Sequence, residues 1–148
     1  MQFMRATVHA RMSDELTILG NGPTTDPSKT LETFPNHNPE RFYLVKLHSD
    51  EFTCVCPQTG QPDFATIRIR YVPDERIVES KSFKLYLWSY RDQGAFHEHV
   101  VNIMLDDLVA AAGPHWSEVA ADFAVRGGVA ITVTAEHVRT VEARNQWR

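Results

Sequence analysis

The chain of 148 residues has the length of a single domain and is long enough to bury a core of its own. Hydrophobic residues make up 43% and charged residues 23% of the sequence, and these proportions exclude a disordered or fibrous chain. Fifteen Lys and Arg against nineteen Asp and Glu give a formal net charge of −4. This mild acidity gives no electrostatic reason to expect nucleic acid or an anionic membrane as a partner. We therefore expect one domain over residues 1–148, with neither partner.

The two cysteines, Cys54 and Cys56, indicate whether the protein works in an oxidising or a reducing compartment. A disulfide between residues so close in sequence closes almost no loop and stabilises little, so free thiols in a reducing compartment are expected. No apolar run reaches the roughly 18–20 residues of a membrane-spanning helix, and the amino terminus does not resemble a secretory signal. The sequence predicts a cytoplasmic protein.

The first half of the chain predicts an irregular arm followed by strands. Residues 1–30 show little periodicity and are expected to form the arm. Alternating side chains predict a strand over 41–48 and a clearer one over 65–71. In the second strand the apolar residues share one face, and the other face is polar and solvated (Thr66, Arg68, Arg70). A proline-containing turn is expected over 73–75.

The second half changes to a helical period. Apolar spacing predicts one helix from Ser80 to near Gly94 and another over about 95–112, which Gly113 and Pro114 stop. Strands are expected over about 119–125 and 129–133, joined by a hairpin turn at Gly127 and Gly128. Residues 138–148 allow either a frayed helix or a tail.

The order of elements is therefore strand, strand, helix, helix, strand, strand. Two antiparallel hairpins around a helix pair are typical of an α+β domain in which an antiparallel sheet carries two helices on one face. The sheet of such a domain has edges that need protection from unspecific pairing, and oligomerisation is one way to provide it.

One segment with unusual chemistry is Cys54-Val-Cys-Pro-Gln-Thr-Gly-Gln-Pro-Asp-Phe64, between two predicted strands. Proline fixes φ and removes a donor, so Cys56-Pro57 is expected to be a rigid loop entrance that presents the sulfur to a cavity. The alternative is that each cysteine is a small buried hydrophobic residue at a strand end. Asp63 taken alone is more typical of a turn or capping residue.

A second cluster, Phe96-His97-Glu98-His99, opens the second helix. Adjacent His and Glu side chains cannot both enter the core, so one of them faces a cleft or solvent. A solvated first turn, in which the helix dipole favours Glu98, explains the same residues without a binding role.

A third cluster runs from Val78 to Tyr86. Lys81 and Lys84 are three residues apart and share a helix face, and Ser80 or Ser82 is suited to cap the helix. On spacing alone, a capped amphipathic helix with a solvated basic face explains this segment.

Together, the three segments resemble a known family. Cys-Pro-x-Thr-Gly-Gln-Pro-Asp-Phe, Val-Glu-Ser-Lys-Ser-Phe-Lys-Leu-Tyr and Phe-His-Glu, in this order and spacing, resemble the NADPH-dependent 7-cyano-7-deazaguanine reductases, the nitrile reductases of queuosine biosynthesis. The likeness runs from about Leu31 to Gly128, and the length is similar to that of the short, single-module form. The resemblance implies the tunnelling fold, whose ββααββ unit agrees with the predicted order. It also implies a homo-oligomer of pentameric rings pairing into a decamer, with active sites between subunits.

The resemblance also implies catalytic roles. Cys56 would be the nucleophile that adds to the nitrile and forms a covalent thioimide, with local activation of its thiol expected. Asp63 would be the acid that protonates the nitrile nitrogen, and for this it would have to be protonated before the attack or receive the thiol proton itself.

Binding roles follow from the same resemblance. Glu98 would accept two hydrogen bonds from the deazaguanine ring, and His97 would hydrogen-bond the substrate or assist proton transfer. Two further sets would bind substrate (Val78, Glu79, Ser80) and NADPH (Lys81, Ser82, Lys84). The family commonly has serine or another small residue where Cys54 stands, and on a strand Cys54 and Cys56 would face the same way.

Two other functions remain open on the residues alone. A zinc-dependent pterin-type cyclohydrolase of the same fold would use a cysteine and histidines as metal ligands, for which candidates are present (Cys54, Cys56, His97, His99). The Glu-Ser-Lys-Ser segment has no role in that scheme, and the reductase needs no metal. The third possibility is a non-catalytic, ring-forming protein that binds a deazapurine or pterin.

Overall fold

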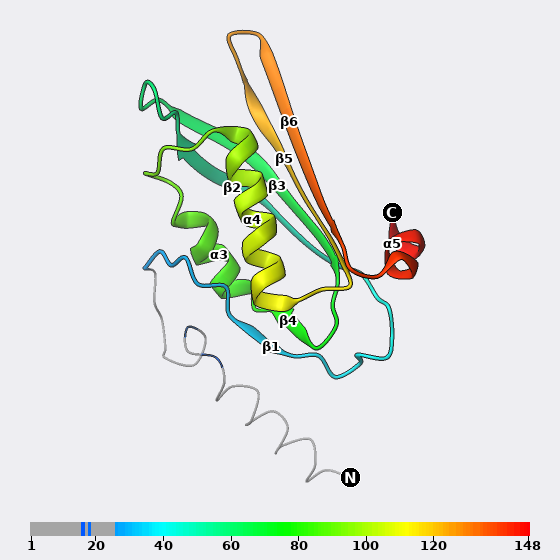
Figure 1. Ribbon diagram of the computed structural model, residues 1–148. Helices are drawn as coiled ribbons and strands as arrows, with labels where there is room; N and C mark the ends of the chain where they lie inside the picture. Colours follow the sequence, from blue (N-terminus) through cyan, green and yellow to red (C-terminus); the bar gives the residue numbers. More distant parts are fainter. Residues whose placement is uncertain (1–15, 17, 19–25) are drawn as a thin grey trace.

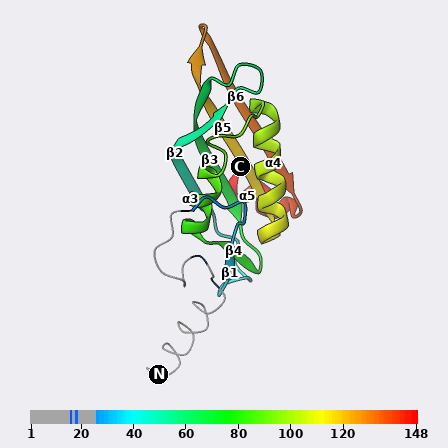
Figure 2. The same cartoon turned by 90° about the vertical axis from the view of Figure 1, so that its left-hand side faces the viewer.

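The computed structural model describes residues 16, 18 and 26–148, and its centre is a sheet with helices on one face (Figure 1). The sheet has four antiparallel strands in the order β2-β3-β5-β6. They are β2 (Val45–Val55), β3 (Pro62–Val72), β5 (Trp116–Arg126) and β6 (Val129–Val138). Helices α3 (Ser80–Trp88) and α4 (His97–Ala112) cover one face of this sheet, as the side view confirms (Figure 2). The expected order of elements and the α+β layer are confirmed.

Two features lie outside the expected unit. A small second sheet pairs β1 (Thr33–Pro35) with β4 (Arg76–Val78), which the short, irregular sequence around them did not indicate. After β6 the chain forms a short helix, α5 (Val141–Trp147), which decides between the helix and the tail considered for this region. The expected irregular arm over 1–30 lies for the most part outside the described residues.

Several predicted boundaries were wrong. The strand expected over 41–48 begins at Val45 and continues to Val55, because β3 pairs with it along that whole length. Phe42 and Leu44, whose alternation suggested the earlier start, instead pack against a small cluster beside α5. The helix expected to reach Gly94 ends at Trp88 and is followed by turns.

The core lies between the sheet and the two helices. Alternate residues of β3 face it, and Ile67, Ile69 and Tyr71 are at most 2% exposed. The opposite face is polar, as predicted: Arg68 pairs with Asp122, and Arg70 pairs with Glu118, across the β3–β5 ladder. Within the described part of the chain, no helix has the length and apolar character to cross a membrane. The sheet and helices thus form a rigid frame whose ends carry the loops.

Candidate active site

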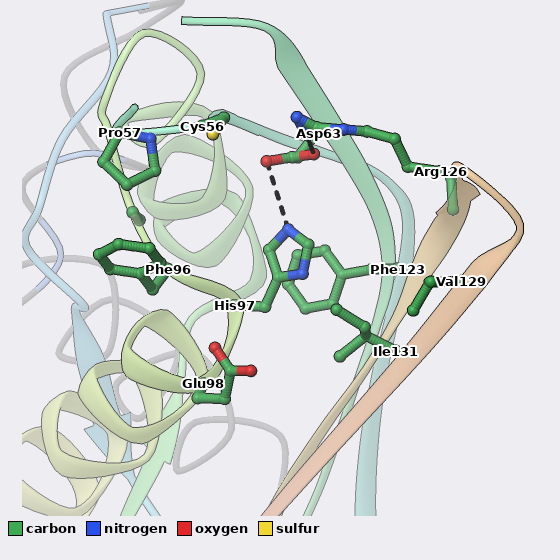
Figure 3. Close-up of a pocket in the computed structure, with 12 residues that line it drawn as sticks. Cys56, Pro57, Asp63, Phe96, His97, Glu98, Phe123, Arg126, Val129 and Ile131 are labelled. Carbon is green, nitrogen blue, oxygen red and sulfur yellow. Dashed lines mark hydrogen bonds and ion pairs between the residues drawn. The ribbon is translucent and has the colours of Figure 1, made fainter. Parts of the chain in front are cut away.

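A pocket of about 350 Å³ lies where the β2–β3 loop, the start of α4 and the end of β5 meet (Figure 3). This volume is in the range of small-molecule sites, roughly 300–1,000 Å³. Its lining includes six residues with chemical or stacking potential: Cys56, Asp63, His97, Glu98, Phe123 and Arg126. The structure therefore brings together four residues that the sequence singled out, from two segments more than thirty positions apart in the chain.

The loop after β2 presents Cys56 to this pocket. The strand ends at Val55, and a tight turn follows in which the Gly60 amide donates to the Cys56 carbonyl at 2.8 Å. The Cys56 amide donates to the Gln61 carbonyl, also at 2.8 Å. Gly60 has φ of 70°, a left-handed conformation that favours glycine, so the turn explains the glycine at this position.

The two cysteines have different environments. Cys54 is fully buried in the core, where desolvation raises the pKa of its thiol to about 11. Cys56 lies just beyond the end of the strand and is partly exposed, so the rule for alternating strand residues does not apply to it. Hydrogen bonding, first from the Thr59 hydroxyl and then from backbone amides, lowers the pKa of Cys56, and Arg126 adds a smaller favourable charge interaction. Of the two thiols, that of Cys56 is the more exposed and the more readily ionised.

The Thr59 hydroxyl offers a direct test of this activation. Thr59→Val removes the hydroxyl and keeps the shape of the side chain, so the pKa of Cys56 is expected to rise toward its ordinary value. Less thiolate is then present at neutral pH, and alkylation of Cys56 by iodoacetamide is expected to slow there and to recover at alkaline pH. The measurement is the alkylation rate as a function of pH, with Cys56→Ser identifying the modified thiol. An unchanged rate profile would show that the backbone amides and Arg126 activate the sulfur without the hydroxyl.

Asp63 lies at the start of β3 and is held from two sides. Its side chain is 7% exposed, and Arg126 Nη1 lies 2.6 Å from Oδ1. His97 Nε2 lies 3.2 Å from Oδ2. The His97 ring stacks on Phe123 with a centroid distance of 3.7 Å and an angle of 9° between the planes. The carboxylate and the imidazole therefore form one ordered unit next to Cys56.

The start of α4 supplies His97 and Glu98 to the same pocket. Glu98 is exposed in the first turn, where the helix dipole favours its charge, and its carboxylate lies beside His97 (Figure 3). His99 is exposed, and its ring packs against Phe96 rather than lining this pocket. The alternative of a merely solvated first turn thus describes His99 but not His97.

The segment from Val78 to Lys84 lies away from this pocket in the folded protein. It spans the end of β4 and the start of α3, near the carboxyl end of α4, whereas His97 is at the opposite end of that helix (Figure 1). Glu79 caps α3 by accepting hydrogen bonds from the amides of Lys81 and Ser82, so the cap is neither of the serines considered. Ser82 is fully buried, and its hydroxyl accepts from the Glu32 amide at 3.0 Å.

A second hollow of about 640 Å³ separates α3 from β2. Two predicted residues, Ser80 and Lys84, line it together with Trp88 and Arg91. Lys81 is half-buried, and its Nζ donates to the Ile18 carbonyl at 3.2 Å. None of the residues from 78 to 84 lines the pocket that holds Cys56.

The ligands that a zinc cyclohydrolase would need are dispersed. Cys54 is inside the core, and His99 does not line the pocket that contains Cys56 and His97. Over residues 16, 18 and 26–148, the structure forms no group of three His, Cys, Asp or Glu side chains able to hold a metal ion.

Three residues of the site were missed by sequence reasoning: Thr59, Phe123 and Arg126. In the sequence pattern, Phe123 is typical of a strand residue that faces the core. Arg126 precedes a Gly-Gly hairpin turn, where an arginine is common and indicates no function. The partners of Phe123 and Arg126 are distant in sequence, so no local pattern could have identified these two residues. Thr59 is only three positions from Cys56, within the quoted Cys-Pro-x-Thr motif.

Comparison with known proteins decides the family. The model of the family described as QueF-like protein matches residues 62–142. The NADPH-dependent 7-cyano-7-deazaguanine reductase of Syntrophus aciditrophicus (strain SB) is 60% identical over 82% of this chain and 86% of its own. That of Anaeromyxobacter dehalogenans (strain 2CP-C) is 64% identical over 76% of this chain and 93% of its own. The chain belongs to the 7-cyano-7-deazaguanine reductase family.

The fold agrees with this family assignment. The crystal structure of the archaeosine synthase QueF-Like in the apo form superposes with a TM-score of 0.59 and 28% sequence identity. It covers 63% of this chain and 91% of its own. The tunnelling fold expected from the resemblance is confirmed. The four residues for which the resemblance implies a role at the nitrile or the ring line one pocket (Cys56, Asp63, His97, Glu98).

Proposed function

We propose that the protein reduces the nitrile of 7-cyano-7-deazaguanine to the aminomethyl group of 7-aminomethyl-7-deazaguanine, with two NADPH per turnover, in tRNA queuosine biosynthesis. The observation that carries this proposal is the meeting of an activated thiol, Cys56, with the Asp63–His97 pair and Glu98 in one pocket. The relatives described above have the nitrile substrate and the dependence on NADPH in their names.

The chemistry begins with the sulfur. The Cys56 thiolate attacks the nitrile carbon, a C–S bond forms, and the π electrons of the C–N bond move to nitrogen, which takes a proton. The product is a thioimide, in which carbon is ready to accept hydride from NADPH. A second hydride, after the thiolate has left, completes the four-electron reduction to the amine. Asp63 is the proposed source of the first proton, because its carboxyl group lies in the same pocket as the sulfur.

Recognition of the base is assigned to α4. A carboxylate has two acceptor oxygens and can bind the N1–H and the exocyclic amine of the deazaguanine ring side by side, so Glu98 is the proposed ring-binding residue. His97 is already oriented by Asp63 and by its stacking on Phe123. It is placed to hydrogen-bond the substrate or to deliver a proton to the reduced nitrogen.

The remaining residues require an assembly. Val78, Glu79 and Ser80 for substrate, and Lys81, Ser82 and Lys84 for NADPH, lie away from the Cys56 pocket of their own chain. We propose that the segment of a neighbouring copy completes each site, in pentameric rings that pair into a decamer. Large apolar side chains exposed near the β5–β6 turn, Val125 at 66% and Val129 at 60%, support an interface there.

In this scheme the buried residues hold the segment and the exposed ones bind ligand. Glu79 and Ser82 are occupied by capping and backbone hydrogen bonds, so they shape the start of α3. Lys84 is exposed and able to meet an NADPH phosphate as a point charge. The free thiols of Cys54 and Cys56 support a cytoplasmic location for the reaction.

The test is intact mass spectrometry of the full-length protein mixed with 7-cyano-7-deazaguanine in the absence of NADPH. A mass gain equal to that of the nitrile is expected, because addition of a thiol to a nitrile loses no atom. Cys56→Ser is expected to show no gain, and addition of NADPH to the wild-type adduct is expected to remove it with release of the amine. Binding of the base with neither a mass gain nor NADPH oxidation would contradict the proposal and favour the non-catalytic binding protein.

A further inference from the structure

Arg126 is the residue of the pocket that neither the sequence motifs nor the proposed mechanism uses. The Nη1 atom of its guanidinium lies 2.6 Å from Asp63 Oδ1, and the Nη2 atom lies 3.4 Å from Gln61 Oε1. The charge of the guanidinium also lowers the pKa of the Cys56 thiol. One side chain from the end of β5 therefore contacts the acid and the loop, and its charge acts on the thiol in the same pocket.

The β5–β6 ladder accounts for this orientation. Its register shifts between Phe123 and Arg126, immediately before the turn at Gly127 and Gly128. With uninterrupted alternation Arg126 would share the outer face of the sheet with Asp122, which pairs there with Arg68. An irregularity of this kind changes the direction of a side chain, and such irregularities are common beside active sites.

The carboxylate of Asp63 uses its two oxygens for two different partners. Oδ1 faces Arg126 and Oδ2 faces His97, whose ring is in turn fixed by Phe123. Asp63 is 7% exposed, whereas Arg126 is 42% exposed, so the arginine reaches the acid from the solvent side. These two contacts fix the orientation of the carboxylate.

The charged and titratable groups around Asp63 come from four parts of the chain. They are Arg126 from β5, His97 and Glu98 from α4, Cys54 from β2, and Cys56 from the loop. Of these groups, only Arg126 keeps a positive charge at every pH at which the protein is folded. It is the charged partner that fixes the carboxylate of Asp63 before the substrate arrives.

We infer that Arg126 is a positioning residue of the nitrile addition: it holds the Asp63 carboxylate oriented so that the carboxylate takes the proton of the Cys56 thiol and passes it to the nitrile nitrogen. This inference rests on the proposed function. In the step, the S–H bond breaks and Asp63 becomes neutral. The C–S bond then forms, the C–N π pair moves to nitrogen, and nitrogen takes the proton from Asp63. Thiol and nitrile become a thioimide without oxidation or reduction, and the carboxylate returns to its pair with Arg126.

The first arm of the test measures adduct formation without NADPH as a function of pH. Arg126→Gln is expected to slow the adduct at neutral pH by roughly 10- to 100-fold, the usual cost of misplacing a reacting group, and to move the acidic limb of the rate profile to higher pH. Arg126→Lys keeps the charge but not the planar fork and is expected to recover part of the rate. Arg139→Gln is the matched control, because Arg139 is 46% exposed and pairs with Asp74 outside the pocket.

The second arm needs no nitrile. Because the charge of Arg126 lowers the pKa of the Cys56 thiol, alkylation of Cys56 by iodoacetamide at neutral pH is expected to be slower in Arg126→Gln than in wild type or Arg139→Gln. Wild-type adduct rate and pH profile in a folded Arg126→Gln variant would overturn the inference. If the wild-type protein forms no adduct, the proposed function fails, and the alkylation rate of Cys56 alone decides the role of Arg126. A slower rate in Arg126→Gln than in wild type supports that role, and an equal rate overturns it.

Discussion

Cys56→Ala is expected to abolish NADPH oxidation in the presence of 7-cyano-7-deazaguanine, with turnover reduced by a factor on the order of 10³ or more. The alanine cannot form the covalent bond, and hydride transfer to the free nitrile has no thioimide to act on. Cys56 lies in a loop beyond the end of β2, so the substitution leaves the core untouched. Turnover is measured by the loss of NADPH absorbance at saturating base.

Cys54→Ala is the matched control for this experiment. Cys54 is fully buried, and its thiol, with a pKa of about 11, stays protonated at neutral pH. Loss of the sulfur is expected to destabilise the fold by about 1 kcal/mol, the scale of one buried methylene, and to leave turnover within a few-fold of wild type. If Cys54→Ala abolished turnover in folded protein while Cys56→Ala did not, the assignment of the nucleophile would be reversed.

Asp63→Asn is expected to slow formation of the covalent adduct by about 10²- to 10⁴-fold, the range of general acid–base catalysis. Asparagine occupies the same space and can still contact Arg126 and His97, but it neither accepts the thiol proton nor delivers one to nitrogen. The measurement is the rate of mass gain on mixing with the nitrile. A wild-type rate in this variant would show that another group protonates the nitrogen.

A comparison of Asp63→Asn with Arg126→Gln separates two contributions to the rate of adduct formation. The first variant removes the proton carrier, and the second removes the cation that orients it. The adduct rate of Asp63→Asn should therefore be the lower of the two, and the double variant should be no slower than Asp63→Asn alone, since residues acting as one unit are not additive.

The regular parts of the fold could be predicted from local sequence. The alternation over 65–71 is that of a half-buried strand, and β3 contains all of it. The Gly127-Gly128 turn has φ of 58° and 77°, values that glycine adopts at no steric cost. Gly113 ends α4 with φ of 52°, as the Gly-Pro pair predicted. In each case the residues that determine the conformation are neighbours in sequence.

The parts that were not predicted depend on long-range pairing. β1 has three residues and exists because β4 pairs with it, with Phe34 opposite Ile77. β2 extends to Val55 because β3 continues alongside it, and this extension buries Cys54 and leaves Cys56 in the loop. Propensity within a short window contains no information about either partner.

The same distinction applies to the active site. Residue types and spacing in the sequence determined which chemistry was available: a Cys-Pro loop with an aspartate seven residues on, and a His-Glu pair at a helix start. Only the tertiary structure decided which thiol reaches the pocket and which cation accompanies the acid, since Arg126 and Asp63 are 63 positions apart. Burial and charge pairing act through space between elements that the sheet brings together, and they determine the reactivity that each side chain has in the folded protein.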